Sequence, residues 1–97
     1  MTDVNQAKAA VHIIVHGHVQ GVGFRSFVHM RALPLHIAGW VRNCADGTVE
    51  IWAEGPRDKL ERLAQQVQKG PRYGLVSRLD VDWQQPENLL RDFHIRW

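Results

Sequence analysis

The chain has 97 residues, of which 44% are hydrophobic and 23% are charged, and its formal net charge is +2. This length fits a single domain, and the composition is that of a globular protein, which excludes extensive disorder. The small positive charge does not by itself indicate nucleic acid, and the single cysteine excludes an intramolecular disulfide. Residues 1–10 are polar and no apolar run reaches the roughly 20 residues that cross a bilayer, so we expect a flexible leader and a cytoplasmic protein.

Residues 11–16 form the first predicted strand. They are mostly β-branched, and alternating apolar residues share one face, namely Val11, Ile13 and Val15. Residues 17–23 contain three glycines, which predicts a loop with unusual backbone angles or a closely approaching ligand. We expect one domain that starts with this strand and extends over residues 11–97.

A first helix is predicted to begin at Gly23 or Phe24, where apolar side chains start to recur at helical spacing. Pro34 has no N–H group and clashes with the carbonyl group four residues before it, so the regular helix should stop or kink near Leu33. No glycine follows to cap the helix. The sequence leaves open which of the two happens.

A hairpin and a second helix come next. Strands are predicted at residues 37–44 and 48–54, and the Asp46-Gly47 pair between them favours a tight turn. The buried face of the later strand would carry Val49, Ile51 and Ala53. A helix then starts at Gly55-Pro56, with proline in its first turn, and ends at Gly70-Pro71. Its apolar stripe consists of Leu60, Leu63, Ala64 and Val67.

Two further strands close the chain. Residues 75–83 predict a strand whose inward-facing residues are Leu79, Val81 and Trp83, and after a loop a terminal strand holds Phe93, Ile95 and Trp97. The order of elements predicts an α+β fold, a ferredoxin-like α/β sandwich of βαββαβ type with an additional C-terminal strand. Two helices would cover one face of a mostly antiparallel sheet. Polar residues would cover the other, among them Arg78, Asp80 and Asp82.

The stretch from Gly17 to Arg25 carries the clearest chemical signal. It joins a strand to a helix, so its backbone N–H groups and the helix N-terminus can bind one phosphate together. Arg25 lies in the first helical turn and offers a planar set of donors to phosphoryl oxygens. A nucleotide-binding P-loop would need a lysine and a serine or threonine where this chain has Phe24-Arg25. The glycines also stand in the wrong order for dinucleotide binding.

This stretch resembles the first signature of the acylphosphatase family, Gly-x-Val-Gln-Gly-Val-x-Phe-Arg. A second signature of that family is matched by Gly39-Trp40-Val41-Arg42-Asn43, followed by Asp46-Gly47-Thr48-Val49 and by Gly55. The resemblance extends over about residues 11–97. It departs from the family at Leu33-Pro34-Leu35-His36, where a leucine-glycine pair is common.

The resemblance implies a metal-independent hydrolase, acting on acid anhydrides, that cleaves acyl phosphates to a carboxylate and inorganic phosphate. Arg25 would bind the phosphate and Asn43 would position the attacking water. The phosphate-binding loop of this family would consist here of Val19, Gln20, Gly21, Val22, Gly23, Phe24 and Arg25. No cofactor is expected. The partners would be a small acyl phosphate and inorganic phosphate, as product and inhibitor, with no nucleic acid and no membrane.

Several residues have simpler interpretations. Arg25 could be a solvated arginine and Asn43 a turn residue, although their coincidence with the glycine loop favours a site. Three histidines lie close together, at positions 12, 16 and 18, but no carboxylate or cysteine accompanies them in the sequence, so we expect no metal. Cys44 has only Arg42 nearby in the sequence to activate its thiol, so we do not expect it to be a nucleophile. The tryptophans are expected to be packing residues: Trp40, Trp52, Trp83 and Trp97.

Two other functions stay open. A non-catalytic module that binds acyl phosphate or carbamoyl phosphate would use the same loop, as does a related domain at the front of hydrogenase-maturation carbamoyltransferases. A domain that binds single-stranded RNA could share the general fold. The predicted third strand lacks the aromatic residues of such domains and carries Glu50, which disfavours RNA.

Overall fold

A five-stranded sheet forms the centre of the structure, a computed structural model that describes residues 7–97. Its strands are β1 (Lys8–His18), β2 (Ala38–Asn43), β3 (Val49–Pro56), β4 (Leu75–Gln84) and β5 (Phe93–Ile95), in the order β4-β1-β3-β2-β5. Neighbouring strands are antiparallel except β2 and β5, which are parallel. This is the predicted ferredoxin-like fold with its additional C-terminal strand.

The first strand is longer than the sequence predicts. Lys8, Ala9 and Ala10 pair with the end of β3, so they belong to the sheet and not to the flexible leader expected at residues 1–10. The remainder of that leader, residues 1–6, lies outside the described residues. In the described part of the chain, no helix has the length and apolar character that a membrane span requires.

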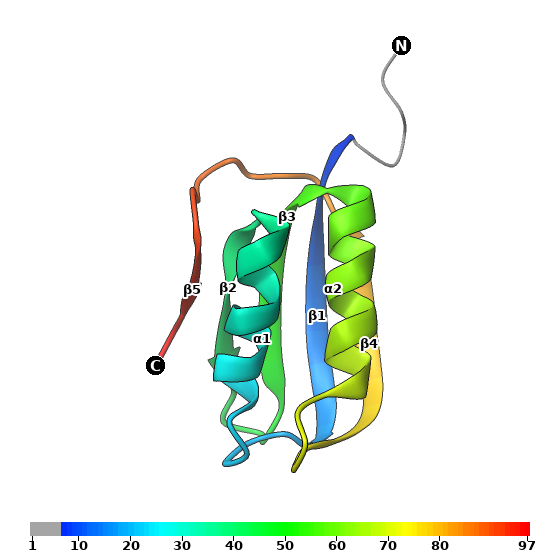
Figure 1. Ribbon diagram of the computed structural model, residues 1–97, viewed down its shortest axis with the longest axis vertical. Coiled ribbons are helices and arrows are strands. Elements are labelled where there is room, and N and C mark those ends of the chain that lie inside the picture. The colour runs from blue at the N-terminus through cyan, green and yellow to red at the C-terminus, as the bar shows by residue number, and fades with distance from the viewer. Residues whose placement is uncertain (1–6) are drawn as a thin grey trace.

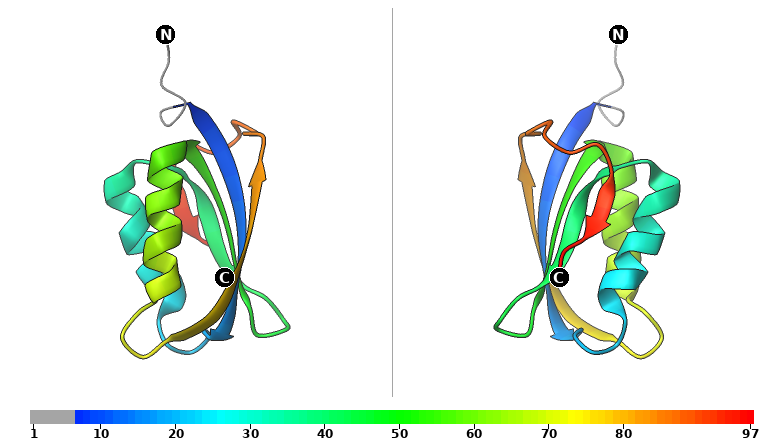
Figure 2. Two further views of the ribbon diagram at one scale, coloured as in Figure 1. Left: turned by 90° about the vertical axis from the view of Figure 1, so that its right-hand side faces the viewer. Right: turned by 90° about the vertical axis from the view of Figure 1, so that its left-hand side faces the viewer.

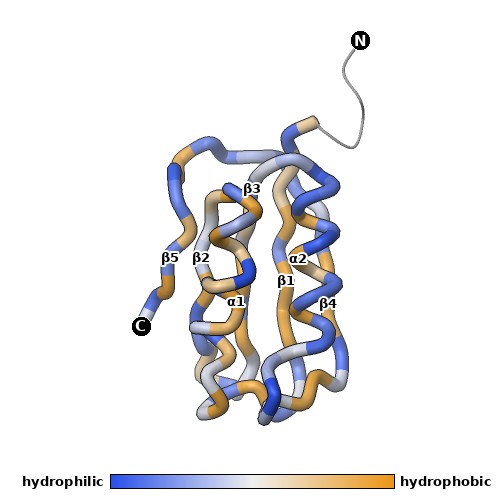
Figure 3. Tube along the Cα trace, in the orientation of Figure 1, coloured by the Kyte–Doolittle hydropathy of each residue, from blue (hydrophilic) through white to orange (hydrophobic). Residues whose placement is uncertain are grey.

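Both helices, α1 (Phe24–Ala32) and α2 (Arg57–Lys69), lie on the same face of the sheet (Figures 1 and 2). In Figure 3, hydrophilic and hydrophobic residues alternate along α2, as expected for a helix with one buried side. The core between the helices and the sheet is built from fully buried apolar side chains: Val11, Ile13, Val15, Phe24, Val28, Val41, Val49, Ile51, Ala53, Leu60, Leu63 and Val67. The predicted inner faces of β1, β3 and α2 are therefore confirmed, except that Ala64 is only partly buried.

The end of α1 follows from Pro34. The regular helix stops at Ala32 and continues as a short 3₁₀ turn over Leu33–Leu35. His36 then adopts a left-handed conformation with φ of 54° and donates its backbone N–H to the Leu33 carbonyl oxygen at 3.2 Å. A histidine thus occupies the position where glycine is usual, and the helix stops instead of kinking.

Two details differ from the sequence prediction. Pro56 is the last residue of β3 and precedes α2, which begins at Arg57, so it does not lie in the first helical turn. Val81 was expected to face inward with Leu79 and Trp83, but 42% of it is exposed, whereas the other two pack against the core. The reason is that β4 is an edge strand, at which the helical layer ends.

Glu54 anchors the loop that leads from β4 to β5. Glu54 is 3% exposed as a residue. Its carboxylate accepts hydrogen bonds from the backbone N–H groups of Glu87 and Asn88, at 3.1 and 3.0 Å, and from the Trp52 indole at 2.8 Å. Burial raises the pKa of Glu54, but these hydrogen bonds outweigh it, so the net shift is below the usual 4.5. The carboxylate form is therefore the one that holds the loop.

We expect Glu54→Ala to lower the free energy of unfolding by about 2–4 kcal/mol, because it removes a buried charged acceptor and leaves its donors unpaired. Since the folded pKa is depressed, the contribution of Glu54 is present above the unfolded pKa and is lost as pH falls through the lower folded pKa. Urea unfolding at neutral and acidic pH measures both effects. A destabilisation of Glu54→Ala that is equal at both pH values would contradict this assignment.

Candidate functional site

The glycine-rich loop and the β2–β3 hairpin meet at one end of the sheet, at the bottom of Figure 1. A cavity of about 200 Å³ lies there and is lined by Val19, Gly21, Gly23, Phe24, Arg25, Ser26, Asn43 and Trp97. Arg25 and Asn43, which the sequence singles out separately, thus line the same cavity from different elements. Of the seven residues predicted to form the loop, Gln20 and Val22 do not line it.

The backbone of the loop depends on glycine at two positions. Gly21 and Gly23 have φ angles of 75° and 76°, in the left-handed region that side chains disfavour. Gly23 is also the residue that precedes α1 as its N-cap. Among the described residues, no side chain caps this helix and its first turn contains no acidic residue. The N–H groups at the start of α1 therefore face the cavity region without a competing carboxylate, which favours an anion.

Gln20 ties the loop to the hairpin. Its side-chain Nε2 donates to the carbonyl oxygens of Cys44 at 2.7 Å and Thr48 at 2.9 Å. These two residues close the turn between β2 and β3, since the Cys44 N–H donates to the Thr48 carbonyl oxygen. Gln20 therefore fixes the distance between the loop and the strand end that carries Asn43. This role could not be predicted, because its acceptors are backbone atoms more than 20 residues away.

Arg25 is half-buried and has contacts with the C-terminal residues. Its guanidinium carbon lies 4.2 Å from the centroid of the Trp97 ring, and its Nη1 donates to the Arg96 carbonyl oxygen at 3.3 Å. The sequence predicts Trp97 to be a packing residue of the terminal strand. This prediction is wrong, because Trp97 lies beyond the end of β5 and is 91% exposed. The tryptophan instead forms one wall of the cavity.

Asn43 is the last residue of β2 and pairs with Val49 of β3. Its side-chain Oδ1 is buried and has no hydrogen-bond partner within residues 7–97. The turn that follows uses other groups: the Asp46 carboxylate accepts from the Thr48 N–H at 3.0 Å and from the Thr48 hydroxyl at 2.6 Å. These hydrogen bonds lower the pKa of Asp46. The Asn43 oxygen is therefore not committed to the turn and is available to a molecule in the cavity.

His12 and His16 lie on the face of β1 opposite to its buried residues. Contrary to expectation, each of them has a carboxylate partner: His12 Nε2 lies 2.6 Å from Glu50 Oε2, and His16 Nε2 lies 2.8 Å from Asp80 Oδ2. These pairs could not be predicted from the sequence. Their members are separated by 38 and 64 positions in the chain and become neighbours only through the strand register. No group of three or more potential metal ligands is present between residues 7 and 97.

Charges on this face are locally balanced. Arg42 Nε donates to Glu50 Oε1 at 2.6 Å, which raises the pKa of Arg42. Burial raises the pKa of Glu50, but hydrogen bonds from His12 and Arg42 outweigh this effect and lower it. The hydrogen bond from His16 lowers the pKa of Asp80. None of these paired residues lines the cavity. The charged side chain in the lining is that of Arg25.

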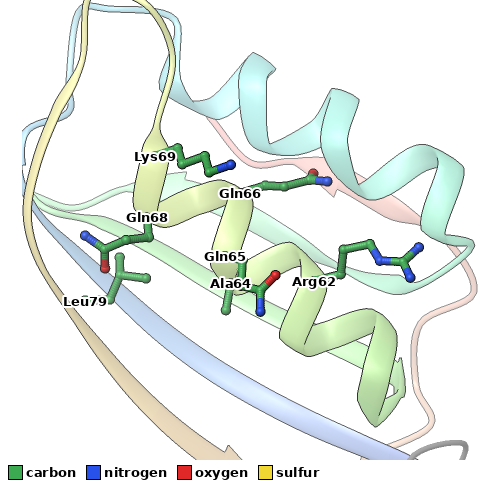
Figure 4. A pocket seen from close by; sticks show the side chains of 7 residues that line it. All are labelled: Arg62, Ala64, Gln65, Gln66, Gln68, Lys69 and Leu79. Atoms are coloured by element: carbon green, nitrogen blue, oxygen red, sulfur yellow. The ribbon is translucent and has the colours of Figure 1, made fainter.

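A larger cavity of about 620 Å³ lies along α2 (Figure 4). Its side chains point to opposite sides of the helix: Arg62, Gln66 and Lys69 to one side, and Gln68 to the other, near Leu79. A binding site for a small molecule requires polar side chains that converge on one point, and these side chains do not converge. We therefore assign the candidate site to the smaller cavity.

Known proteins resemble this chain over nearly its whole length. The family model for acylphosphatase matches residues 11–95. The acylphosphatase of Koribacter versatilis is 47% identical over 98% of this chain and 84% of its own length. The crystal structure of the acylphosphatase from Bacillus subtilis superposes with a TM-score of 0.88 at 40% identity, covering 92% of this chain and 99% of that one.

A larger protein contains the same fold as a small part. Full-length HypF, in a phosphate- and nucleotide-bound form, superposes with a TM-score of 0.82 at 26% identity, covering 94% of this chain but only 12% of HypF. The acylphosphatases, by contrast, are matched over most of their own length. On the family match and these relatives, the chain belongs to the acylphosphatase family.

Proposed function

We propose that this protein hydrolyses acyl phosphates, cleaving the carboxyl-phosphate bond to release a carboxylate and inorganic phosphate. The observation that carries the proposal is that Arg25 and Asn43 line one cavity at the start of α1. The guanidinium and the backbone N–H groups of the loop, from Val19 to Arg25, bind the phosphoryl group. A cavity of about 200 Å³ with a guanidinium in its lining suits a small phosphorylated substrate, and membership of the acylphosphatase family points to acyl phosphates.

Asn43 orients the attacking water. Its Oδ1, which has no hydrogen-bond partner within residues 7–97, accepts a hydrogen bond from the water and holds the water oxygen in line with the leaving carboxylate. The water oxygen forms a bond to phosphorus while the phosphorus–oxygen bond to the acyl group breaks, and the carboxylate leaves with the electron pair. The proton of the water passes to a phosphoryl oxygen of the substrate, so no basic side chain is needed.

Arg25 stabilises the charge on the phosphoryl oxygens as the bond breaks. A carboxylate is a good leaving group, so positioning and charge stabilisation supply most of the catalysis and the reaction needs no metal or other cofactor. Inorganic phosphate carries the same oxygens as the substrate and binds at the same place. We also propose a cytoplasmic location, which fits a chain whose single cysteine can form no internal disulfide.

The first test is hydrolysis of benzoyl phosphate by the purified protein with a metal chelator present. We expect turnover that the chelator does not change and that inorganic phosphate inhibits competitively. Loss of activity on chelation, restored by zinc, would overturn the metal-independent mechanism. Phosphate binding without turnover would instead identify a non-catalytic binding module, and a salt-sensitive complex with a labelled RNA oligonucleotide would favour the RNA-binding alternative.

A further inference from the structure

The C-terminal residues reach the candidate site because β5 runs parallel to β2. Gly39 pairs with Phe93 and Val41 with Ile95, so the ends of both strands meet at the same edge of the sheet. Asn43 ends β2 at this edge, and the residues after β5 arrive beside it. The parallel register therefore places Arg96 and Trp97 where Arg25 and Asn43 lie.

Arg96 is held in place from two directions. Its backbone N–H donates to the Val41 carbonyl oxygen at 2.8 Å, which continues the pairing of β5 with β2. Its guanidinium carbon lies 4.3 Å from the centroid of the Trp40 ring. The backbone at Arg96 is thus a fixed point, although the residue itself is exposed.

The two contacts on Arg25 come from the Arg96 backbone and from the next residue, Trp97. The Arg96 carbonyl oxygen accepts from Arg25 Nη1, and the indole of Trp97 covers one face of the guanidinium. A free arginine side chain has many rotamers, and ordering it on binding weakens the affinity for an anion. Contact with an aromatic face restrains the guanidinium and leaves its edge donors free for oxygens.

Trp97 has no structural role that would explain it. It is 91% exposed, and it is not among the residues of the hydrophobic core or those packed against the core. The contact with the cationic side chain of Arg25 accounts for a large apolar residue at this exposed position.

We propose that Trp97 is a positioning residue, which acts through Arg25 by holding its guanidinium in the orientation that binds phosphate. This inference rests on the proposed function, since it assumes that Arg25 receives the phosphoryl group. It assigns a purpose to the extra C-terminal strand, which is to bring Trp97 and the Arg96 carbonyl group to the site.

The test uses the full chain and inorganic phosphate as the probe, so it does not depend on turnover. In Trp97→Ala, the dissociation constant for phosphate is expected to rise by about 3–10-fold, the scale of an exposed cation–π contact together with lost preorganisation. Trp97→Phe should recover most of the affinity, because it restores an aromatic face. The melting temperature should stay the same in both variants, since the side chain is exposed.

Tyr73→Ala is the matched control. Tyr73 is 74% exposed, and the centroid of its ring lies 5.5 Å from the guanidinium carbon of Arg72. Neither residue lines the cavity. We expect its phosphate affinity to equal that of the unmodified protein. A second measurement is the NMR signal of the Arg25 Nε–H group, which the indole ring should shift and which Trp97→Ala should move toward the position of a solvated arginine.

The outcomes separate this inference from the proposed function. Unchanged phosphate affinity in Trp97→Ala, or an Arg25 signal that the substitution does not move, would overturn the positioning role while leaving hydrolysis intact. An unmodified protein that binds phosphate without hydrolysing benzoyl phosphate would overturn the proposed function, and weaker binding by Trp97→Ala would still support the positioning role. A protein that binds no phosphate would overturn both.

Discussion

Arg25→Ala is expected to lower kcat/KM for benzoyl phosphate by about 10²–10³-fold, the scale seen when a donor to the transition state is removed. The affinity for inorganic phosphate should fall with it, because the guanidinium contacts the phosphoryl oxygens in the ground state as well. Arg25→Lys should recover little of either quantity, since an ammonium group offers a point charge and no planar fork. Steady-state kinetics and a phosphate titration measure both effects.

Arg31→Ala is the control for the loss of a positive charge. Arg31 lies on the same helix and its guanidinium carbon is 5.1 Å from the centroid of the Phe27 ring, but it does not line the cavity. We expect near-normal kinetics for this variant. An Arg25→Lys protein with near-normal kinetics would rule out bidentate binding by the guanidinium, and equal losses in the two alanine variants would point to a general charge effect.

The fold was predictable because its signals are local. Alternating apolar residues such as Ile13 and Ile51 mark the inner faces of strands. The apolar stripe through Leu60 and Leu63 marks a helix. Both patterns can be recognised in a short segment without knowledge of the rest of the chain. The glycines of the β1–α1 loop likewise mark a backbone that needs left-handed angles at Gly21 and Gly23. Together with Arg25, they locate one half of the candidate site from the sequence alone.

The rest of the site depends on which strands become neighbours. Nothing in the sequence indicates that β5 pairs in parallel with β2, so the sequence predicts Trp97 only as a packing residue of a terminal strand. The same holds for the pairs of His12 with Glu50 and of His16 with Asp80, which only the strand register brings together. A side chain whose partner is a distant backbone atom, such as Gln20, leaves no pattern of residue types to detect.

Asn43 has a different role from Arg25 in the proposed mechanism, and substitutions at the two positions should therefore differ in kind. Asn43→Ala should reduce kcat by about 10²-fold or more, the scale seen when one hydrogen-bonding group of the transition state is removed, and leave the affinity for inorganic phosphate nearly intact. The reason is that an interaction made mainly in the transition state affects turnover and not ground-state binding. The buried Oδ1 without a partner among residues 7–97 is the atom that the substitution removes.

If Asn43 were only a turn residue, its substitution would lower the free energy of unfolding by about 1 kcal/mol, a typical cost of a lost local hydrogen bond, and spare the turnover of folded protein. Asp46→Ala supplies the reference for that case, because the Asp46 carboxylate makes the side-chain hydrogen bonds of the turn and does not line the cavity. This control should melt at a lower temperature and keep its kcat. A thermal melt, a phosphate titration and a single-turnover rate on both variants decide between the two roles, and a folded Asn43→Ala protein with normal turnover would remove Asn43 from the mechanism.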